Sequence, residues 1–194
     1  IWMIAHEGRA AVVDPGDPTP VLKTLEEQGL ALDPIIITHH HFDHTGGVSA
    51  LKKATGCRVI GPDNPKIADI DETMTEGARV TVLGYGFEIM EVPGHTLDHI
   101  AYYNAEDGTL FCGDTLFVGG CGRVFEGTFP MMQQSLAKLS HLPSETKVYC
   151  THEYTMANLS FARKVEPTNA DLSAHIDSCQ KQRDNDLPLS LIHI

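Results

Sequence analysis

The chain has 194 residues, 42% of them hydrophobic, which suffices for one globular domain with a sizeable core and a small additional region. Fourteen lysines and arginines stand against 26 aspartates and glutamates, and the formal net charge of −12 disfavours sequence-independent binding to nucleic acid or to an anionic membrane surface. No run approaches the ~20 consecutive apolar residues that a membrane helix needs. We therefore expect a soluble protein.

Five cysteines are an odd number at irregular spacing, in a chain too long to depend on disulfides: Cys57, Cys112, Cys121, Cys150 and Cys179. We expect reduced thiols, a cytoplasmic location and a monomer. Eleven histidines, several of them close together, direct attention to metal binding instead.

The first half of the chain alternates β-branched runs with amphipathic segments. It predicts, in order, strands at 2–5 and 10–13, a helix at 20–29, a strand at 35–37 and a helix at 48–55. The middle is largely β, with strands at 58–60, 79–83, 87–92, 100–103 and 109–112. A helix at 131–142, a strand at 147–150, a helix at 156–165 and a polar helical segment over 167–185 follow. This order predicts a layered α/β sandwich with its helices outside.

Four imidazoles and one carboxylate lie within six residues directly after the apolar run 35–37. Imidazole and carboxylate are the ligands that suit zinc and other divalent first-row metals. On extended backbone His39 and His41 point the same way and His40 points the opposite way. Asp43 and His44 are expected on the turn that follows, displaced enough to serve a second metal.

Three further ligand-type residues each lie just past the end of a predicted strand: His95, Asp114 and His152. Each is weak evidence alone, because a lone polar residue after a strand is more often a cap or a loop residue. Together with the first cluster they make two sets of three ligands and one carboxylate left to bridge. That arithmetic predicts a two-metal hydrolase. We expect two divalent ions, zinc first, with iron and manganese as the alternatives.

The His-x-His-x-Asp-His motif, followed in order by Gly94-His95-Thr96, Gly113-Asp114-Thr115 and Thr151-His152-Glu153-Tyr154, resembles the metallo-β-lactamase superfamily. Within it, segments 120–128 and 151–155 resemble the bacterial type of the glyoxalase II, or hydroxyacylglutathione hydrolase, family. The resemblance covers nearly the whole chain. It implies a metallo-β-lactamase-type αββα sandwich as the catalytic domain, at 1–155. A helical glutathione-binding region at 156–194 would be partial, because the family continues further.

The resemblance also implies a role for each site residue. His39, His41 and His95 would bind one metal, and Asp43, His44 and His152 the other, with Asp114 bridging; Asp43 and Asp114 are the predicted catalytic residues. Glutathione would contact Arg123, Phe125 and Tyr154. Asp14 would orient the metal ligands from behind. The family often has glycine where Asp98 stands.

The activity implied by this resemblance is metal-dependent hydrolysis of S-(2-hydroxyacyl)glutathione thioesters, S-D-lactoylglutathione giving D-lactate and glutathione, in the detoxification of methylglyoxal. A hydroxide bridging the two metals would attack the thioester carbonyl. The leaving thiolate has a conjugate acid of pKa ~8.5 and needs no strong general acid. The expected partner is this small molecule, with no nucleic acid or membrane.

Two alternatives stay open. One is a persulfide dioxygenase-like enzyme with a single iron, against which Phe42 and the run Phe125–Thr128 favour the hydrolase. The other is a metal-binding fragment without turnover. A β-lactamase is less favoured, because Asp114 stands where the best-known members have a cysteine ligand, and a nuclease is disfavoured by the charge of −12.

Overall fold

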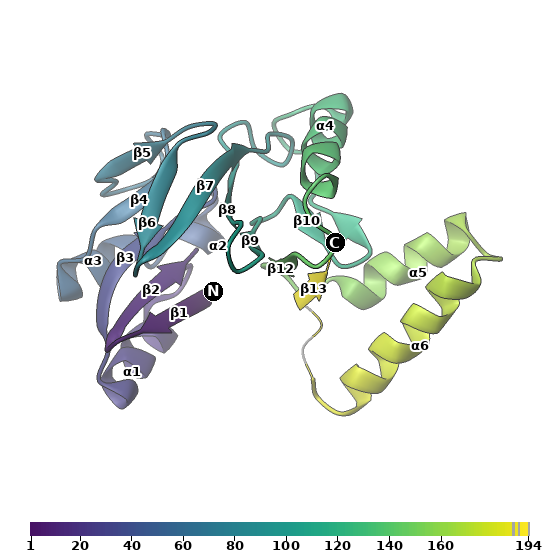
Figure 1. Cartoon of the computed structure of the whole chain (residues 1–194), viewed down its shortest axis with the longest axis horizontal. Coiled ribbons are helices and arrows are strands. Elements are labelled where there is room, and N and C mark those ends of the chain that lie inside the picture. The colour runs from purple at the N-terminus through teal and green to yellow at the C-terminus, as the bar shows by residue number, and fades with distance from the viewer. Residues whose placement is uncertain (188, 190, 194) are drawn as a thin grey trace.

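Two β-sheets lie face to face, with helices on the outer face of each and a helical hairpin at one end (Figure 1). This computed structural model describes residues 1–187, 189 and 191–193. The predicted αββα sandwich is confirmed. Residues 188, 190 and 194 of the predicted helical region 156–194 lie outside the described residues.

The first sheet has the order β1-β2-β3-β4-β5, in which only the β1–β2 hairpin is antiparallel. Its strands are β1 (Trp2–His6), β2 (Arg9–Val13), β3 (Ala31–Ile36), β4 (Val59–Pro62) and β5 (Glu72–Met74). Helices α1 (Pro18–Gln28) and α3 (Val48–Thr55) cover its outer face. The side chain of Asp17 caps α1 at its start, and Gly29 ends the helix in the left-handed conformation.

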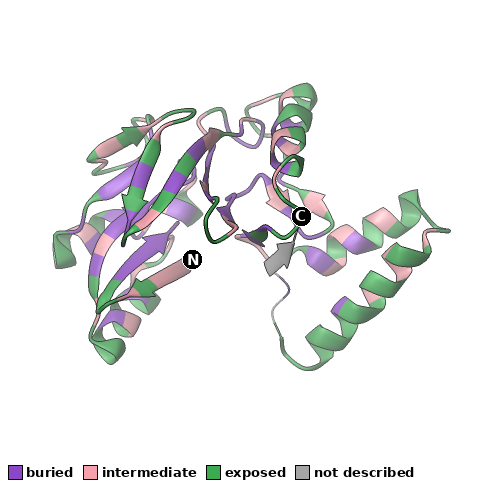
Figure 2. Cartoon of the chain, in the orientation of Figure 1, coloured by how far each residue is buried: buried purple, intermediate pink, exposed green. Residues whose placement is uncertain are grey.

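Successive side chains of β2 point to opposite faces of the sheet, so this strand contributes to two layers of the core. Ala10 and Val12 pack against the helices of the first layer, whereas Ala11 and Val13 face the second sheet. Buried residues of both sheets form the core between them, and in Figure 2 they alternate with exposed residues along the strands. Within it, the fully buried Tyr102 donates a hydrogen bond of 2.9 Å from Oη to the carbonyl of Ile37, which ties the second sheet to the end of β3.

The second sheet has the order β13-β12-β9-β8-β7-β6. Its strands are β6 (Arg79–Val82), β7 (Tyr85–Glu91), β8 (Ile100–Asn104), β9 (Thr109–Phe111), β12 (Lys147–Tyr149) and β13 (Leu191–His193). Neighbours are antiparallel except β9 and β12, which run parallel. Helix α4 (Phe129–Ser140) packs through Leu139 on the outer face, and a small ribbon of β10 (Leu116–Phe117) and β11 (Gly120–Cys121) lies beside it.

The last two helices, α5 (Thr155–Val165) and α6 (Ala170–Asp184), form a hairpin that projects from the sandwich (Figure 1). Leu159, Cys179 and Leu189 make its small core. Glu153 fastens this hairpin, because its Oε2 accepts a hydrogen bond of 2.7 Å from the backbone amide of Leu189.

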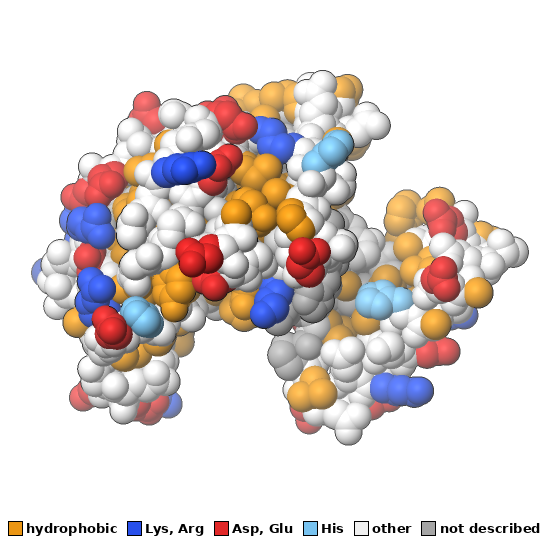
Figure 3. Space-filling view, in the orientation of Figure 1, with side chains coloured by type: hydrophobic (Ala, Val, Ile, Leu, Met, Phe, Trp, Pro, Cys, Tyr) orange, Lys and Arg blue, Asp and Glu red, His pale blue; other side chains and the backbone are white. Residues whose placement is uncertain are grey.

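On the face shown in Figure 3, basic side chains lie singly among acidic ones.

None of the helices in the described part of the chain combines the length and the apolar character that crossing a membrane requires. All five cysteines are free thiols.

Some local expectations were wrong. Asp43 and His44 lie on a one-turn helix, α2 (Phe42–Thr45), and not on a plain turn, because the backbone amides of His44 and Thr45 turn back to the carbonyl of His41. Strand β3 begins four residues earlier than predicted, at Ala31. Strands β5, β10, β11 and β13 were not predicted. Each has two or three residues, too few for a period-two pattern to stand out.

Candidate metal centre and active site

Every candidate ligand lies a few residues after the carboxyl end of a strand. The histidine cluster follows β3, and His95, Asp114 and His152 follow β7, β9 and β12. Those last three strands run parallel, because β8 lies antiparallel between β7 and β9 while β12 pairs parallel with β9. Their carboxyl ends therefore meet at one edge, where α/β sheets commonly bind ligands.

Three imidazoles converge in the first group. The Nδ1 of His41 lies 3.2 Å from the Nε2 of His39 and 3.0 Å from the Nε2 of His95. His39 is fully buried and His95 nearly so, whereas His41 is half-buried on the side of the pocket. Three ring nitrogens at this separation can serve as lone-pair donors to one cation, which is how histidines bind a divalent metal.

The second group contains Asp43, His44 and His152. The Oδ2 of Asp43 lies 3.3 Å from the Nε2 of His152 and 3.5 Å from the Nε2 of His44. Asp114 lies between the two groups: its carboxylate oxygens are 3.3 Å from His44, 3.3 Å from His152 and 3.4 Å from His95. Asp114 is thus the one carboxylate in contact with both groups among the described residues.

His44 provides a test of whether this cluster fits a metal ion. Its Nδ1 lies 3.0 Å from the Oδ2 of Asp14 and donates to it, so the neutral ring carries its lone pair on Nε2. That Nε2 is buried and has no hydrogen-bond partner among the described residues, although Asp43 and Asp114 face it. In the metal-free chain a proton on Nε2 satisfies this arrangement, and a divalent metal that replaces the proton would be held by His44 and both carboxylates.

The electrostatics of the cluster also favour a bound cation. Burial lowers the pKa of His44, but the charges of Asp14 and Asp114 outweigh this effect and raise the pKa to about 10. Burial would raise the pKa of Asp114, whereas hydrogen bonding to His152 and His44 holds that pKa far below its usual range. Burial also holds the pKa of His39 well below its usual value. The site therefore attracts positive charge while His39 stays neutral, the form that ligates metals.

Asp14 supports the loop that carries the histidine cluster, on the side away from the pocket. Its carboxylate accepts hydrogen bonds from the backbone amide of Thr38 at 2.8 Å and from the Thr38 hydroxyl at 2.7 Å, in addition to the bond from His44. Asp14 itself has a left-handed backbone with φ of 51°, which is uncommon for this residue. The buried carboxylate is thus fixed by three donors at the start of the histidine cluster.

Asp114 is fixed in a similar way. Its backbone amide donates to the Nε2 of His99 at 3.0 Å, and its Oδ1 accepts a bond of 2.6 Å from the Thr151 hydroxyl. His99 is fully buried and stacks on His39, and burial lowers the pKa of its ring to about 4. His99 is therefore a neutral acceptor behind the cluster.

A pocket of about 540 Å³ opens over both groups, with the expected glutathione contacts on its wall. The guanidinium of Arg123 lies 5.1 Å from the ring centroid of Phe125, and the ring of Tyr154 stacks on His152 with centroids 5.3 Å apart. Phe125 and Tyr154 are more than half exposed. The structure thus brings all eleven predicted site residues to one pocket or directly behind it.

Gly122 is a residue of this site that the sequence analysis did not identify. A Cβ added there would collide with the backbone carbonyl oxygen of Asp114 and reach 3.1 Å from the Nδ1 of His95. The sequence signal was available, because Gly122 lies in the glycine-rich segment before Arg123. Only glycine permits the loop that carries Arg123 to approach the candidate ligands Asp114 and His95 this closely.

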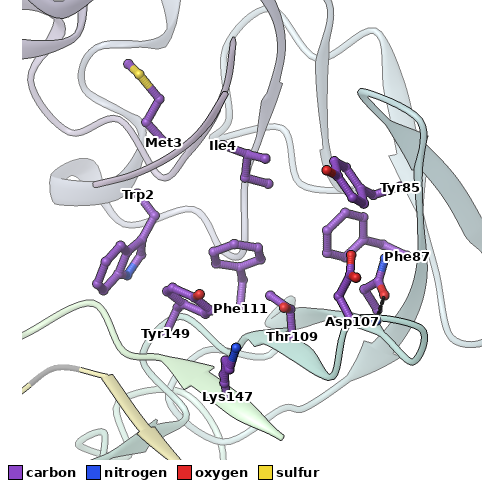
Figure 4. A pocket seen from close by; sticks show the side chains of 11 residues that line it. Trp2, Met3, Ile4, Tyr85, Phe87, Asp107, Thr109, Phe111, Lys147 and Tyr149 are labelled. Carbon is purple, nitrogen blue, oxygen red and sulfur yellow. Dashed lines mark hydrogen bonds between the residues drawn. The ribbon is translucent and has the colours of Figure 1, made fainter. Parts of the chain in front are cut away.

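A second pocket, of about 430 Å³, lies between the two sheets (Figure 4). Trp2, Phe87, Phe111 and Tyr149 line it together with aliphatic side chains, and it contains none of the predicted site residues. Its lining has no cluster of metal ligands. The histidine-lined pocket is therefore the candidate active site.

Comparison with known proteins identifies the family. A sequence profile described as Metallo-beta-lactamase superfamily matches residues 1–152, and one described as Hydroxyacylglutathione hydrolase C-terminus matches residues 153–194. The hydroxyacylglutathione hydrolase of Ectopseudomonas mendocina is 57% identical over 187 residues, which are 95% of this chain and 73% of that protein. The chain belongs to the hydroxyacylglutathione hydrolase family of the metallo-β-lactamase superfamily.

A further relative and two solved structures are also similar to this chain. The hydroxyacylglutathione hydrolase of Pseudomonas aeruginosa strain LESB58 is 55% identical over 190 residues, 96% of this chain and 74% of that protein. Among solved structures, ETHE1 from Myxococcus xanthus has a TM-score of 0.68 and 32% identity, covering 78% of this chain and 69% of its own. A structure titled TTHA1623 in a di-iron-bound form has a TM-score of 0.67 and 28% identity, covering 78% and 85%.

Proposed function

We propose that this member of the hydroxyacylglutathione hydrolase family hydrolyses S-(2-hydroxyacyl)glutathione thioesters. S-D-lactoylglutathione would give D-lactate and glutathione, the step that completes methylglyoxal detoxification. The relatives that carry this name align over almost the whole chain. The observation that carries the proposal is the position of Asp114 between two groups of three ligand-type residues, above a pocket large enough for a thioester.

The proposed cofactors are two divalent ions, one held by His39, His41 and His95 and the other by Asp43, His44 and His152, with Asp114 shared. Zinc suits this set of nitrogen and oxygen ligands, and iron or manganese are the alternatives. The neighbour titled in a di-iron-bound form supports two ions in this fold. When bound, such ions supply a water acidic enough to lose its proton near neutral pH and a positive charge for the thioester carbonyl.

The proposed catalytic residues are Asp43 and Asp114. Two hydrogen bonds fix Asp114: its backbone amide donates to His99, and its carboxylate accepts from the Thr151 hydroxyl. The carboxylate is therefore already oriented toward both groups of ligand-type residues before a metal binds. The carboxylate of Asp43 is largely exposed toward the pocket and is therefore available both to a ligand and to solvent. The thiolate leaving group needs no acid from the chain, because its conjugate acid has a pKa of about 8.5.

The proposed substrate contacts are Arg123, Phe125 and Tyr154. A guanidinium pairs with a carboxylate through two parallel hydrogen bonds, and glutathione has two carboxylates. Phe125 packs under the Arg123 guanidinium and also contacts His41, with ring centroids 5.7 Å apart. The three side chains thus line the approach to the ligands and would hold the peptide part of the substrate while its thioester lies over the cluster.

The net charge and the free thiols bear on the partners and the compartment of the protein. We propose a monomer that acts on a small molecule in the cytoplasm, without nucleic acid or membrane as partner. The net charge of −12 disfavours polyanionic partners, and five free thiols suit a reducing compartment. The catalytic domain would be 1–155, with 156–194 as the helical region beside the substrate.

The test joins metal analysis with turnover. Purified chain should contain two divalent ions per molecule and should release a free thiol from S-D-lactoylglutathione, measured with a thiol reagent. Substitution of Glu27, an exposed residue of α1, by Gln should change neither result. One iron per chain together with oxygen uptake on a persulfide would instead support the dioxygenase alternative, and metal without either activity would support a binding fragment.

A further inference from the structure

A third polar cluster lies beside the two candidate metal groups, around His40. Its other members are Asn64, Lys66, Asp98 and Glu126, which come from three further loops. The side chains of His40 and Asp98 are only 6% and 10% exposed. The activity proposed above uses none of these five residues.

The hydrogen bonds of the cluster are mutually consistent. The Nδ1 of His40 donates to the Oδ1 of Asp98 at 2.9 Å, and the Oδ2 of the same carboxylate accepts from the amide of Asn64 at 2.9 Å. The Nε2 of His40 accepts from the Nζ of Lys66 at 3.2 Å. A His40 ring with its hydrogen on Nδ1 satisfies these two contacts, and the amide nitrogen of Asn64, which lies 3.1 Å from the same Nδ1, then donates to the Oδ2 of Asp98 and not to the ring. Asp98 is therefore the group that fixes the orientation of this ring.

His40, Asp98 and Glu126 are together close enough to hold a cation, but the chain provides one itself. The ammonium of Lys66 lies 3.2 Å from the Nε2 of His40 and 3.6 Å from the Oε1 of Glu126. A third metal would have to displace this ammonium. The geometry favours an internal polar network over a metal site.

This network joins the two loops that matter for the proposed activity. His40 lies between His39 and His41 in the chain, and its ring meets that of His41 edge-on with centroids 5.0 Å apart, so its anchor fixes the backbone from which both ligands project. On the other side, Glu126 accepts a bond of 3.0 Å from the amide of Leu97. The amides of Phe125 and Glu126 donate to the carbonyl of His95 at 3.2 and 3.4 Å.

We propose that Asp98, acting through His40, is a positioning residue that holds His39 and His41 in the geometry that binds the first metal. The inference rests on the proposed metal-dependent function and deepens it. Asp98 is absent from the lining of the 540 Å³ pocket, and within the described part of the chain its carboxylate accepts hydrogen bonds from His40 and Asn64 and none from a candidate ligand. Partners of this kind behind metal ligands typically contribute 10- to 100-fold in metal affinity.

The experiment compares zinc affinity in the purified full chain and in two variants, by competition with a chromophoric chelator. Asp98→Ala removes the acceptor and should weaken the binding of one of the two ions about 10- to 100-fold, with the other largely unchanged. Asp98→Asn keeps an oxygen where the Nδ1 of His40 donates but places an NH2 group where Asn64 donates, so it should lose much less zinc affinity than Asp98→Ala. Activity of the alanine variant should largely recover at saturating zinc.

A matched control separates positioning from general stability. The carboxylate of Asp71 also accepts two bonds, from Lys52 at 2.6 Å and from the amide of Val59 at 2.8 Å, but it lies in a different loop from the ligands. Asp71→Ala should lower the melting temperature of the metal-free chain without changing zinc affinity. If Asp98→Ala does not fold, Asp98→Leu, which has the same branching at Cγ but no acceptor, is expected to show the same loss of affinity.

Several results would overturn the inference. Equal zinc affinities in the parent and Asp98→Ala would do so while leaving the proposed function intact, and so would an equal loss in Asp98→Ala and Asp98→Asn. A third tightly bound ion in the parent, lost in Asp98→Ala, would show that the cluster is itself a metal site. A parent chain that binds no metal would overturn the proposed function and this inference together.

Discussion

The Nδ1 nitrogen of His95 lies 2.7 Å from the backbone carbonyl oxygen of Arg123 and donates a hydrogen bond to it. This bond joins a candidate metal ligand to the loop that carries a candidate substrate contact. Because the acceptor is the backbone, it stays in place whichever side chain residue 123 has. The ring of His95 can therefore be held while the guanidinium is removed, which separates the metal centre from substrate recognition.

The substitution Arg123→Ala is accordingly expected to raise KM for S-D-lactoylglutathione with little change in kcat. Charge-assisted hydrogen bonds contribute about 1.5 to 3 kcal/mol each, so the increase in KM should be about tenfold or more. Steady-state kinetics on the parent and the variant measure it. Arg79→Ala is the control, because Arg79 is exposed on β6 and pairs only with Glu88 among the described residues. A fall in kcat at unchanged KM would contradict the assignment.

Asp114→Ala should deprive the chain of both metal ions or nearly so. Its carboxylate is the group within 3.4 Å of ligands from both candidate groups, and its loss leaves each group one oxygen short. Elemental analysis after gel filtration measures the stoichiometry, and thiol release from the substrate should fall to background. A full complement of two ions in this variant would disprove the bridging role of Asp114.

The convergence of the candidate ligands could be predicted because the signal for it is local in the sequence. Each ligand-type residue stands within eight residues of the end of a strand, and the end of a strand in a layered α/β fold is a place where loops meet. The period-two pattern likewise predicts which residues of β2 face each layer. The count of ligand-type residues predicted two sets of three and a bridge, but only the family resemblance assigned each residue to its set, since spacing alone does not say which loop meets which.

Contacts between loops distant in sequence could not be predicted. The bond from His40 to Asp98 spans 58 residues, and that from Thr151 to Asp114 spans 37. In the sequence Asp98 was only an unusual residue at a position where the family often has glycine. Its role as an acceptor depends on how the turns after β3 and β7 approach each other in three dimensions.

Gly122→Ala tests how closely the loop that carries Arg123 must approach the candidate ligands. The added methyl group would collide with the carbonyl oxygen of Asp114, so the loop has to move away from both Asp114 and His95. We expect a loss of about 1 to 3 kcal/mol in the free energy of unfolding, measured in urea, together with weaker zinc binding. Gly86→Ala is the matched control, because a Cβ there meets no atom within 4 Å. Equal effects of the two substitutions would refute the close approach.

Removal of the metals should lower the stability of the chain without unfolding it. None of the candidate ligands belongs to the hydrophobic clusters that join the sheets and helices, so those clusters persist in the metal-free chain. A ligand that binds only the folded state at 1,000 times its Kd adds about 4 kcal/mol of stability, which for a chain of this size corresponds to ~8 to 16 °C in Tm. Tm should therefore fall by that amount on dialysis against a chelator and return when zinc is added. In Asp114→Ala the same treatments should leave Tm almost unchanged, because the ions have lost their shared ligand. A parent chain whose Tm does not respond to the chelator, while elemental analysis confirms that its metal has been removed, would show that the histidine cluster does not couple metal binding to folding.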